Sequence, residues 1–146
     1  LEQSKDDYQA DIIRNLLKNF LLHSERERRT QGFIEIKKDK NLSLVMRFKE
    51  LLENNFIQHK NVTFYCDEMH ITAKKLNSAT AFVLDESPKS IIINRTLLEA
   101  KRLLAHTSKN SKEISYILGF EEPTNFIKFF RKHVLKTPLE FREKFL

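Results

Sequence analysis

The chain has 146 residues, of which 26 are Lys or Arg and 20 are Asp or Glu, so its formal net charge is +6. Hydrophobic residues make up 40% and charged residues 32%, a balance that excludes a disordered chain and a membrane-spanning one. One cysteine, Cys66, excludes an internal disulfide and a cysteine-based zinc cluster, and it fits the reducing conditions of a cytoplasmic location. The chain begins with Leu rather than Met, so we expect a piece of a longer protein.

The three prolines mark the starts of helices, because each follows a polar residue and opens a stretch of helical apolar periodicity. Thr137 with Glu140, and Asn110 with Glu113, have the spacing of a capping box. Only two glycines are present, which disfavours hairpins and excludes a glycine-rich phosphate loop. The sequence therefore predicts an all-α fold. The expected helices cover residues 8–29, 42–55, 62–69, 72–84, 88–106, 111–118, 123–133 and 138–145.

Composition and charge divide the chain into three expected parts. Residues 1–29 form an amphipathic helix whose apolar face is too wide for a lone helix in water, so we expect it to form a homodimer contact. The residues expected in that contact are Ile12, Leu16 and Phe20. Residues 30–41 are mostly polar and are expected to be a linker. Residues 42–146 hold most of the positive surplus, which suits a polyanionic partner better than a membrane.

An internal repeat at residues 65–76 and 114–126 predicts two units of a short helix, a turn and a second helix. A small side chain stands where the crossed helices meet, and a residue that can adopt positive φ stands at the turn. A bulky apolar residue then enters the core. The paired positions, first copy before second, are Cys66 and Ser115, Met69 and Leu118, His70 and Gly119, and Ile71 and Phe120. Two such copies favour paired helix-turn-helix units over a generic helical bundle.

Further residues around the repeat complete a recognisable pattern. They are Arg95, Ala100-Lys101-Arg102-Leu103-Leu104, Ile114-Ser115, Leu118-Gly119-Phe120, Phe126, Phe130, Arg131, Thr137-Pro138 and Phe141-Arg142. With this pattern, the part from about residue 44 to 146 resembles the DNA-binding domain of AraC/XylS-type transcription regulators. The resemblance implies two helix-turn-helix subdomains joined by the long helix 88–106, each placing its second helix in the major groove of double-stranded DNA. It also suggests an activator with RNA polymerase as a further partner, while the sequence itself leaves activation and repression both open. It places residues 1–29 in the terminal helix of a preceding sensory domain.

The resemblance also assigns DNA-contacting positions. The base-reading positions are Lys74, Asn77 and Ser78 in the first unit, and Pro123, Thr124, Ile127 and Lys128 in the second. Lys74 can donate to guanine and Asn77 can pair with adenine, whereas Pro123 and Ile127 cannot read bases through side-chain hydrogen bonds. We therefore expect the second helix to contact thymine methyl groups or to clamp the backbone. The expected phosphate contacts are Lys75, Arg131, Lys132 and the helix starts near Ser111 and Thr137.

Several residues are assigned to packing rather than to chemistry. The aromatic residues expected in the core, rather than as stacking platforms, are Phe82, Phe126, Phe130 and Phe141, and Arg142 is expected to be structural. The five histidines lack ligand-like spacing, so we expect no catalytic residue, metal or cofactor. The alternative to a DNA-binding regulator is a helical interaction module whose basic face binds an acidic protein. A specific duplex that outcompetes random duplex would separate the two.

Overall fold

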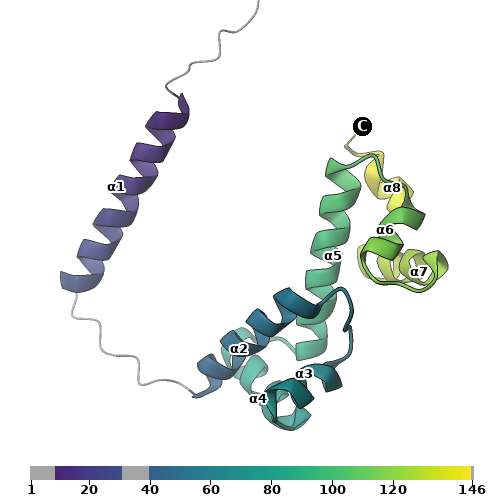
Figure 1. Cartoon of the computed structure of the whole chain (residues 1–146), viewed down its shortest axis with the longest axis horizontal. Helices are drawn as coiled ribbons and strands as arrows, with labels where there is room; N and C mark the ends of the chain where they lie inside the picture. The colour runs from purple at the N-terminus through teal and green to yellow at the C-terminus, as the bar shows by residue number, and fades with distance from the viewer. Residues whose placement is uncertain (1–8, 31–39, 146) are drawn as a thin grey trace, which may run out of the picture. The chain divides into compact units, whose positions relative to one another are not determined.

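The computed structural model describes residues 9–30 and 40–145, and all regular structure in these two ranges is α-helical (Figure 1). The chain divides into two compact units, with α1 (Gln9–Thr30) in the first. The second unit, from Lys40 onward, contains seven helices in its described part. They are α2 (Lys40–Asn55), α3 (Val62–Met69), α4 (Ala73–Leu84), α5 (Pro88–His106), α6 (Ser111–Ile117), α7 (Pro123–Val134) and α8 (Pro138–Arg142). The all-α prediction is confirmed.

The helix ends agree with the predicted ones to within two residues, except at α8. There the helix ends at Arg142 instead of continuing to residue 145. The N–H of Phe145 bonds the carbonyl of Arg142, three residues back, so the chain tightens into a turn. At the other end, Tyr8 and residues 31–39 of the expected linker lie outside the described residues. None of the helices in the described ranges is long and apolar enough to cross a membrane.

Side-chain caps fix where the helices begin. Both predicted capping boxes are confirmed, the first between Asn110 and Glu113 and the second between Thr137 and Glu140. In the first, the Glu113 N–H donates to Asn110 Oδ1 (2.9 Å) while the Asn110 N–H donates to Glu113 Oε2 (2.7 Å). Three other helix starts have a single side-chain cap, from Asn61, Thr72 and Ser87. These local signals explain why sequence alone located most helix starts.

Two hydrophobic cores lie along α5, one near each of its ends (Figure 1). The first core lies between α2, α3, α4 and the beginning of α5, which contributes Ile91 and Ile92. The second lies between the later part of α5 and the helices that follow it. From α5, the second core takes Leu97, Ala100, Leu103 and Leu104. The long helix therefore belongs to both helix-turn-helix units and joins them.

One core prediction is wrong. Phe82 is 72% exposed, because the inward face of α4 is taken by Leu76, Ala79 and Thr80 and the helical period turns residue 82 outward. The other aromatic predictions hold, with Phe126 and Phe130 fully buried and Phe141 packed against the second core.

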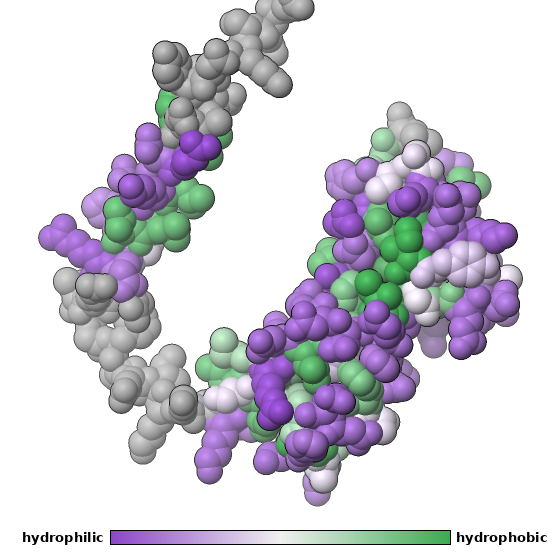
Figure 2. Space-filling model, in the orientation of Figure 1, coloured by the Kyte–Doolittle hydropathy of each residue, from purple (hydrophilic) through white to green (hydrophobic). Residues whose placement is uncertain are grey.

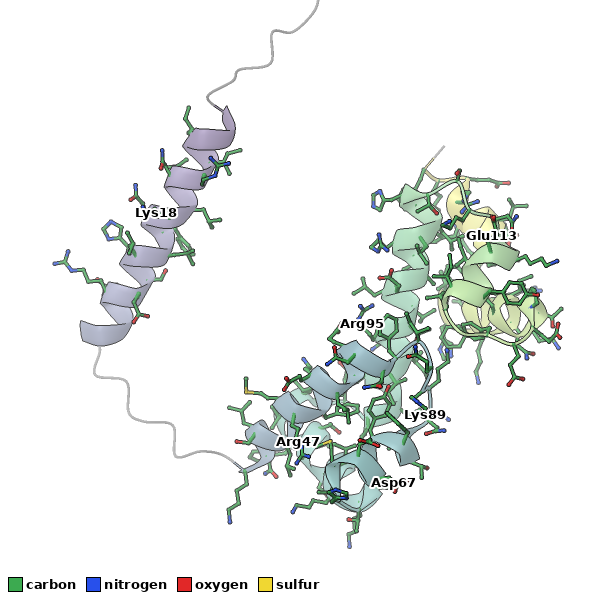
Figure 3. All side chains as sticks on the ribbon, viewed as in Figure 1. Lys18, Arg47, Asp67, Lys89, Arg95 and Glu113 are labelled. Atoms are coloured by element: carbon green, nitrogen blue, oxygen red, sulfur yellow. The ribbon has the colours of Figure 1, made fainter. Side chains whose placement is uncertain are left out.

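Two arginines tie α5 to its neighbours. Arg95 lies where α2 and α5 meet, and its Nε is 2.8 Å from Oε1 of Glu53 on α2 (Figure 3). The Arg95 guanidinium also lies 4.0 Å from the ring centre of Phe56, a cation–π contact. At the far end of α5, Arg142 donates to the carbonyl oxygens of Leu104 (3.1 Å) and Lys109. The structural role predicted for Arg142 is therefore confirmed.

Candidate nucleic-acid interface

The first helix-turn-helix unit consists of α3, a tight turn and α4. His70 ends α3 in the left-handed conformation, with φ at 54°. Its N–H bonds the Asp67 carbonyl, and the Ile71 N–H bonds the Cys66 carbonyl (both 3.0 Å). This pair of bonds satisfies the last carbonyls of α3, and the Thr72 side chain then caps α4. The chain reverses within three residues and starts α4 at a fixed angle.

The second unit, α6 with α7, repeats this turn bond for bond. Gly119 has φ at 72°, its N–H bonds the Tyr116 carbonyl (3.0 Å), and the Phe120 N–H bonds the Ser115 carbonyl (2.9 Å). In both copies the small residue, Cys66 or Ser115, is buried. The predicted repeat is therefore a repeat of backbone geometry.

The base-reading positions predicted on α4 form one exposed stripe. Lys74, Asn77 and Ser78 are all exposed, and their spacing of three and four residues puts them on the same helical face. Leu76 between them is fully buried and anchors the helix on the first core. The structure therefore brings together an ammonium, a carboxamide and a hydroxyl, the donor and acceptor types that distinguish base edges.

The predicted positions on α7 form a matching stripe with different chemistry. Thr124, Ile127 and Lys128 are exposed with the same spacing, while Pro123 at the start of the helix is half-buried. Phe126 and Phe130 hold the opposite face in the second core. The α7 stripe thus offers one hydroxyl, one apolar contact and one positive charge.

The expected phosphate-binding side chains divide into two groups. Lys75, Arg131 and Lys132 are exposed cations on the two second helices. The helix starts at Ser111 and Thr137 instead carry capping boxes, in which a glutamate already accepts from the N-terminal backbone. A carboxylate and a phosphate compete for the same positive end of a helix. The local geometry thus favours the three cations.

A cleft of 440 Å³ between α5 and α7 places the predicted Lys128 and Lys132 beside three basic residues that the sequence interpretation did not include, Lys60, Lys89 and His133. Its floor is apolar, and its rim carries Lys89 of α5 and Lys128, Lys132 and His133 of α7, with Lys60 from the loop before α3. The only sequence signal for these residues was their type, since nothing local predicts that α5 and α7 approach each other. The other four basic side chains extend the basic surface between the two units, whereas the Lys60 ammonium donates to carbonyl oxygens of the protein itself.

Cys66 and Tyr65 are packing residues. Burial raises the pKa of the Cys66 thiol, and the Asp67 carboxylate raises it further, so the thiol stays protonated. Burial also raises the pKa of Tyr65 to about 12, and its hydroxyl donates to the His59 carbonyl (2.7 Å). Within residues 9–30 and 40–145, no cluster of His, Cys, Asp and Glu side chains could hold a metal ion.

Comparison with known proteins decides the family. Residues 65–144, more than half of the chain, match a family model described as a helix-turn-helix domain. The chain belongs to the AraC-type helix-turn-helix family. An AraC-type regulator of Chromobacterium violaceum is similar in fold (TM-score 0.61, 22% identity), over 70% of this chain and 92% of that one. The family and the fold of this AraC-type domain are those of DNA-binding transcription regulators rather than enzymes.

Two curated relatives are regulators. The uncharacterized HTH-type transcriptional regulator YdiP of Escherichia coli (strain K12) is 30% identical over 100 residues, covering 59% of this chain and 33% of that protein. The lactose operon transcription activator of Staphylococcus xylosus is 29% identical over 96 residues, covering 66% of this chain and 34% of that protein. The AraC-type chain therefore spans about a third of the length of these relatives.

Proposed function

We propose that this AraC-type domain regulates transcription by placing α4 and α7 in two successive major-groove segments of one duplex. The proposal rests on the two matched stripes, which are exposed at equivalent positions of repeated units. The joining helix α5 has 19 residues and so spans roughly 28 Å. Successive segments on one face of B-DNA are about 34 Å apart. A modest bend in the DNA would reconcile the two lengths.

The two helices contribute unequally in this proposal. On α4, Lys74 donates to guanine O6 and N7, Asn77 pairs with adenine, and Ser78 bonds a neighbouring edge. On α7, Ile127 contacts a thymine methyl group. Thr124 and Lys128 sit beside it, and Arg131 and Lys132 neutralise phosphates. Pro123 and Lys75 flank these contacts, and the capped helix starts at Ser111 and Thr137 have a secondary role at most, because a glutamate already occupies each of them. Sequence preference thus comes mainly from α4, and affinity from both helices.

Selection of preferred sites from random duplex tests this function. The 146-residue chain should enrich a two-segment site that outcompetes random duplex by about 10³-fold or more. Its affinity should fall steeply between 50 and 200 mM salt, roughly tenfold for every two phosphates neutralised. Binding without any preferred site would overturn the proposal and favour the acidic-protein partner instead.

We also propose that α1 is the terminal helix of a preceding sensory domain and forms a homodimer contact. Ile12, Leu16 and Phe20 are 52%, 63% and 66% exposed and recur every four residues. Figure 2 shows apolar atoms along one flank of α1 and polar ones along the other. Leu16→Glu with Phe20→Glu should halve the solution mass of the full-length protein. Lys18→Glu, on the polar flank, is the control and should leave the mass unchanged (Figure 3).

We also propose that the protein acts in the cytoplasm and has RNA polymerase as a partner. A relative named as a transcription activator supports a role in activation, and a buried, protonated thiol fits a reducing compartment. Transcription in vitro with RNA polymerase, from a template that carries the selected site, should rise when the full-length protein is added. An unchanged or lowered yield would contradict activation.

A further inference from the structure

One lysine outside the recognition helices joins the two helix-turn-helix units. Lys60 lies in the loop between α2 and α3, and its Nζ donates to the carbonyl oxygen of Leu118, at the end of α6 (2.6 Å). The same Nζ donates to the Ile57 carbonyl of its own loop (2.6 Å) and reaches the Gly119 carbonyl at 3.5 Å. It also lies 4.8 Å from the ring centre of Phe120. The contact spans 58 residues of sequence.

The environment of Lys60 differs from that of a solvated surface lysine. The residue is half-buried, and this desolvation lowers the pKa of its amine. An ammonium group removed from water is stable only where hydrogen bonds and ring contacts replace its hydration. Carbonyl oxygens from two separate units and an aromatic face fill that role here. The arrangement thus requires both units to be in place together.

A second observation at the same point is the close approach of Gly119. A β-carbon built there would lie 2.2 Å from the Ile57 carbonyl oxygen, far inside van der Waals contact. The backbone of the second turn therefore lies directly against the loop of the first unit. We call this group, made of Ile57, Lys60, Leu118 and Gly119, the joint.

The joint is placed where it can control α7. Gly119 and Phe120 form the turn that leads into α7, which begins at Pro123. The two units are also connected through α5, which leads into the start of α6. The joint is an additional point of attachment at the other end of α6. Two points of attachment restrict a rotation that a single helix would allow.

We propose that Lys60 is a positioning residue that fixes the separation and angle of α4 and α7, so that the protein selects duplexes whose two segments have one spacing. This inference rests on the proposed binding of both helices to one duplex. Once α4 is bound, the contact of α7 with the same duplex is intramolecular. The effective concentration of α7 at its segment is high when α7 is held at the correct distance. If the joint is loosened, α7 still contacts the DNA, but this contact depends less on the spacing between the two segments.

Binding to duplexes of altered spacing tests the role of Lys60. The selected site is compared with the same site carrying two extra base pairs between the segments, and with a duplex carrying the first segment alone. The two-base-pair insertion should reduce the affinity of the wild-type chain about 30-fold and that of Lys60→Met less than about 5-fold. The affinities of the two proteins for the first segment alone should agree within about 2-fold. Lys49→Met, which removes one charge from the exposed surface of α2, is the matched control and should behave as wild type.

A measurement without DNA gives an independent readout. Spin labels at Ala81→Cys on α4 and Asn125→Cys on α7, both exposed positions, report the distance between the helices once Cys66 is replaced by Ala. The distance distribution should broaden in Lys60→Met and stay narrow in Lys49→Met. If Lys60→Met does not fold, Lys60→Gln carries the same expectation, because its side chain is one bond shorter and carries no charge.

The outcomes separate this inference from the function on which it rests. Equal spacing discrimination and equal distance distributions in the Lys60 and Lys49 variants would overturn the positioning role while leaving two-segment binding intact. A wild-type chain that binds the first segment alone as tightly as the full site would overturn two-segment binding, and the positioning role with it.

Discussion

The two helix-turn-helix units have the same turn built from different residues. In the first, His70 adopts a φ of 54° despite its side chain, while in the second Gly119 adopts 72°. The N–H groups of Ile71 and Phe120 bond carbonyls five residues back in both. Backbone hydrogen bonds and one buried small residue therefore define the helix-turn-helix unit. The exposed surface is then free to differ.

The exposed stripes differ in this way. The α4 stripe presents hydrogen-bonding groups at all three positions, whereas the α7 stripe presents one hydroxyl, the apolar Ile127 and one charge, with a further cation, Arg131, beyond the stripe. Directional groups distinguish bases, and a charge binds any phosphate. One structural unit can therefore supply most of the selectivity while its copy supplies affinity. Substitutions at equivalent places in the two units test this difference.

The two turns should respond very unequally to substitution. Gly119→Ala should lower the free energy of unfolding by about 3 kcal/mol, since it strains a left-handed residue and forces a β-carbon against the Ile57 carbonyl. His70→Gly should stay within about 1 kcal/mol of wild type, because relief of strain offsets the added chain entropy. Urea denaturation measures both. A Gly119→Ala variant as stable as wild type would show that the loop withdraws freely.

The recognition helices should separate selectivity from salt dependence. Asn77→Ala should reduce discrimination at one base pair by about 2 kcal/mol while changing the salt slope little. Arg131→Ala should keep the preferred site but lower the slope of log affinity against log salt by about 1. Competition binding at several salt concentrations distinguishes them. If both variants lost selectivity equally, this would contradict the proposal that α4 supplies most of the selectivity and α7 mainly affinity.

The helix starts of the two units should differ in strength. Asn110→Ala combined with Glu113→Ala removes both bonds of the reciprocal box and should cost about 2 kcal/mol, whereas Asn61→Ala removes a single cap and should cost about 1 kcal/mol. Thermal unfolding of both variants provides the measurement. Equal losses would mean that the Glu113 bond back to the Asn110 N–H adds nothing.

The smallest effect concerns the helix that joins the units. The hydrogen bond from Arg102, together with the charges of Arg102 and Arg95, lowers the pKa of Glu99 below its ordinary 4.5. Its carboxylate therefore stabilises the fold above pH 4.5, and this contribution disappears as the pH falls through the lowered pKa. Glu99→Gln should cost about 0.5 kcal/mol at pH 7 and progressively less below pH 4.5. A difference from wild type that is constant from pH 7 to 3 would contradict this.

Local signals explain why most of the fold could be predicted. Prolines at helix starts, capping boxes and apolar periodicity are all short-range features, and they located the helices of the second unit within a few residues. Phe82 shows the limit of residue type as a guide. Its aromatic ring suggested burial, but the small residues Ala79 and Thr80 already fill the inward face.

The candidate site was predictable only in part, for the same reason. The shared exposure of Lys74, Asn77 and Ser78 on α4 follows from helical spacing, whereas their base-reading role came from the resemblance to AraC/XylS-type domains. The joint depends on a contact across 58 residues, and Lys60 has no local pattern that marks it. The α5–α7 cleft likewise requires knowledge of how two distant helices approach each other.

The sharing of α5 between both cores has a thermodynamic consequence. Its early turns are packed by Ile91 and Ile92 and its later turns by Leu103 and Leu104, so melting either half removes the support of the other. Neither unit can lose its core and leave α5 fully formed. The whole region from Lys40 onward should therefore melt in a single calorimetric transition, and a cavity made in the core of one unit should lower the stability of the other.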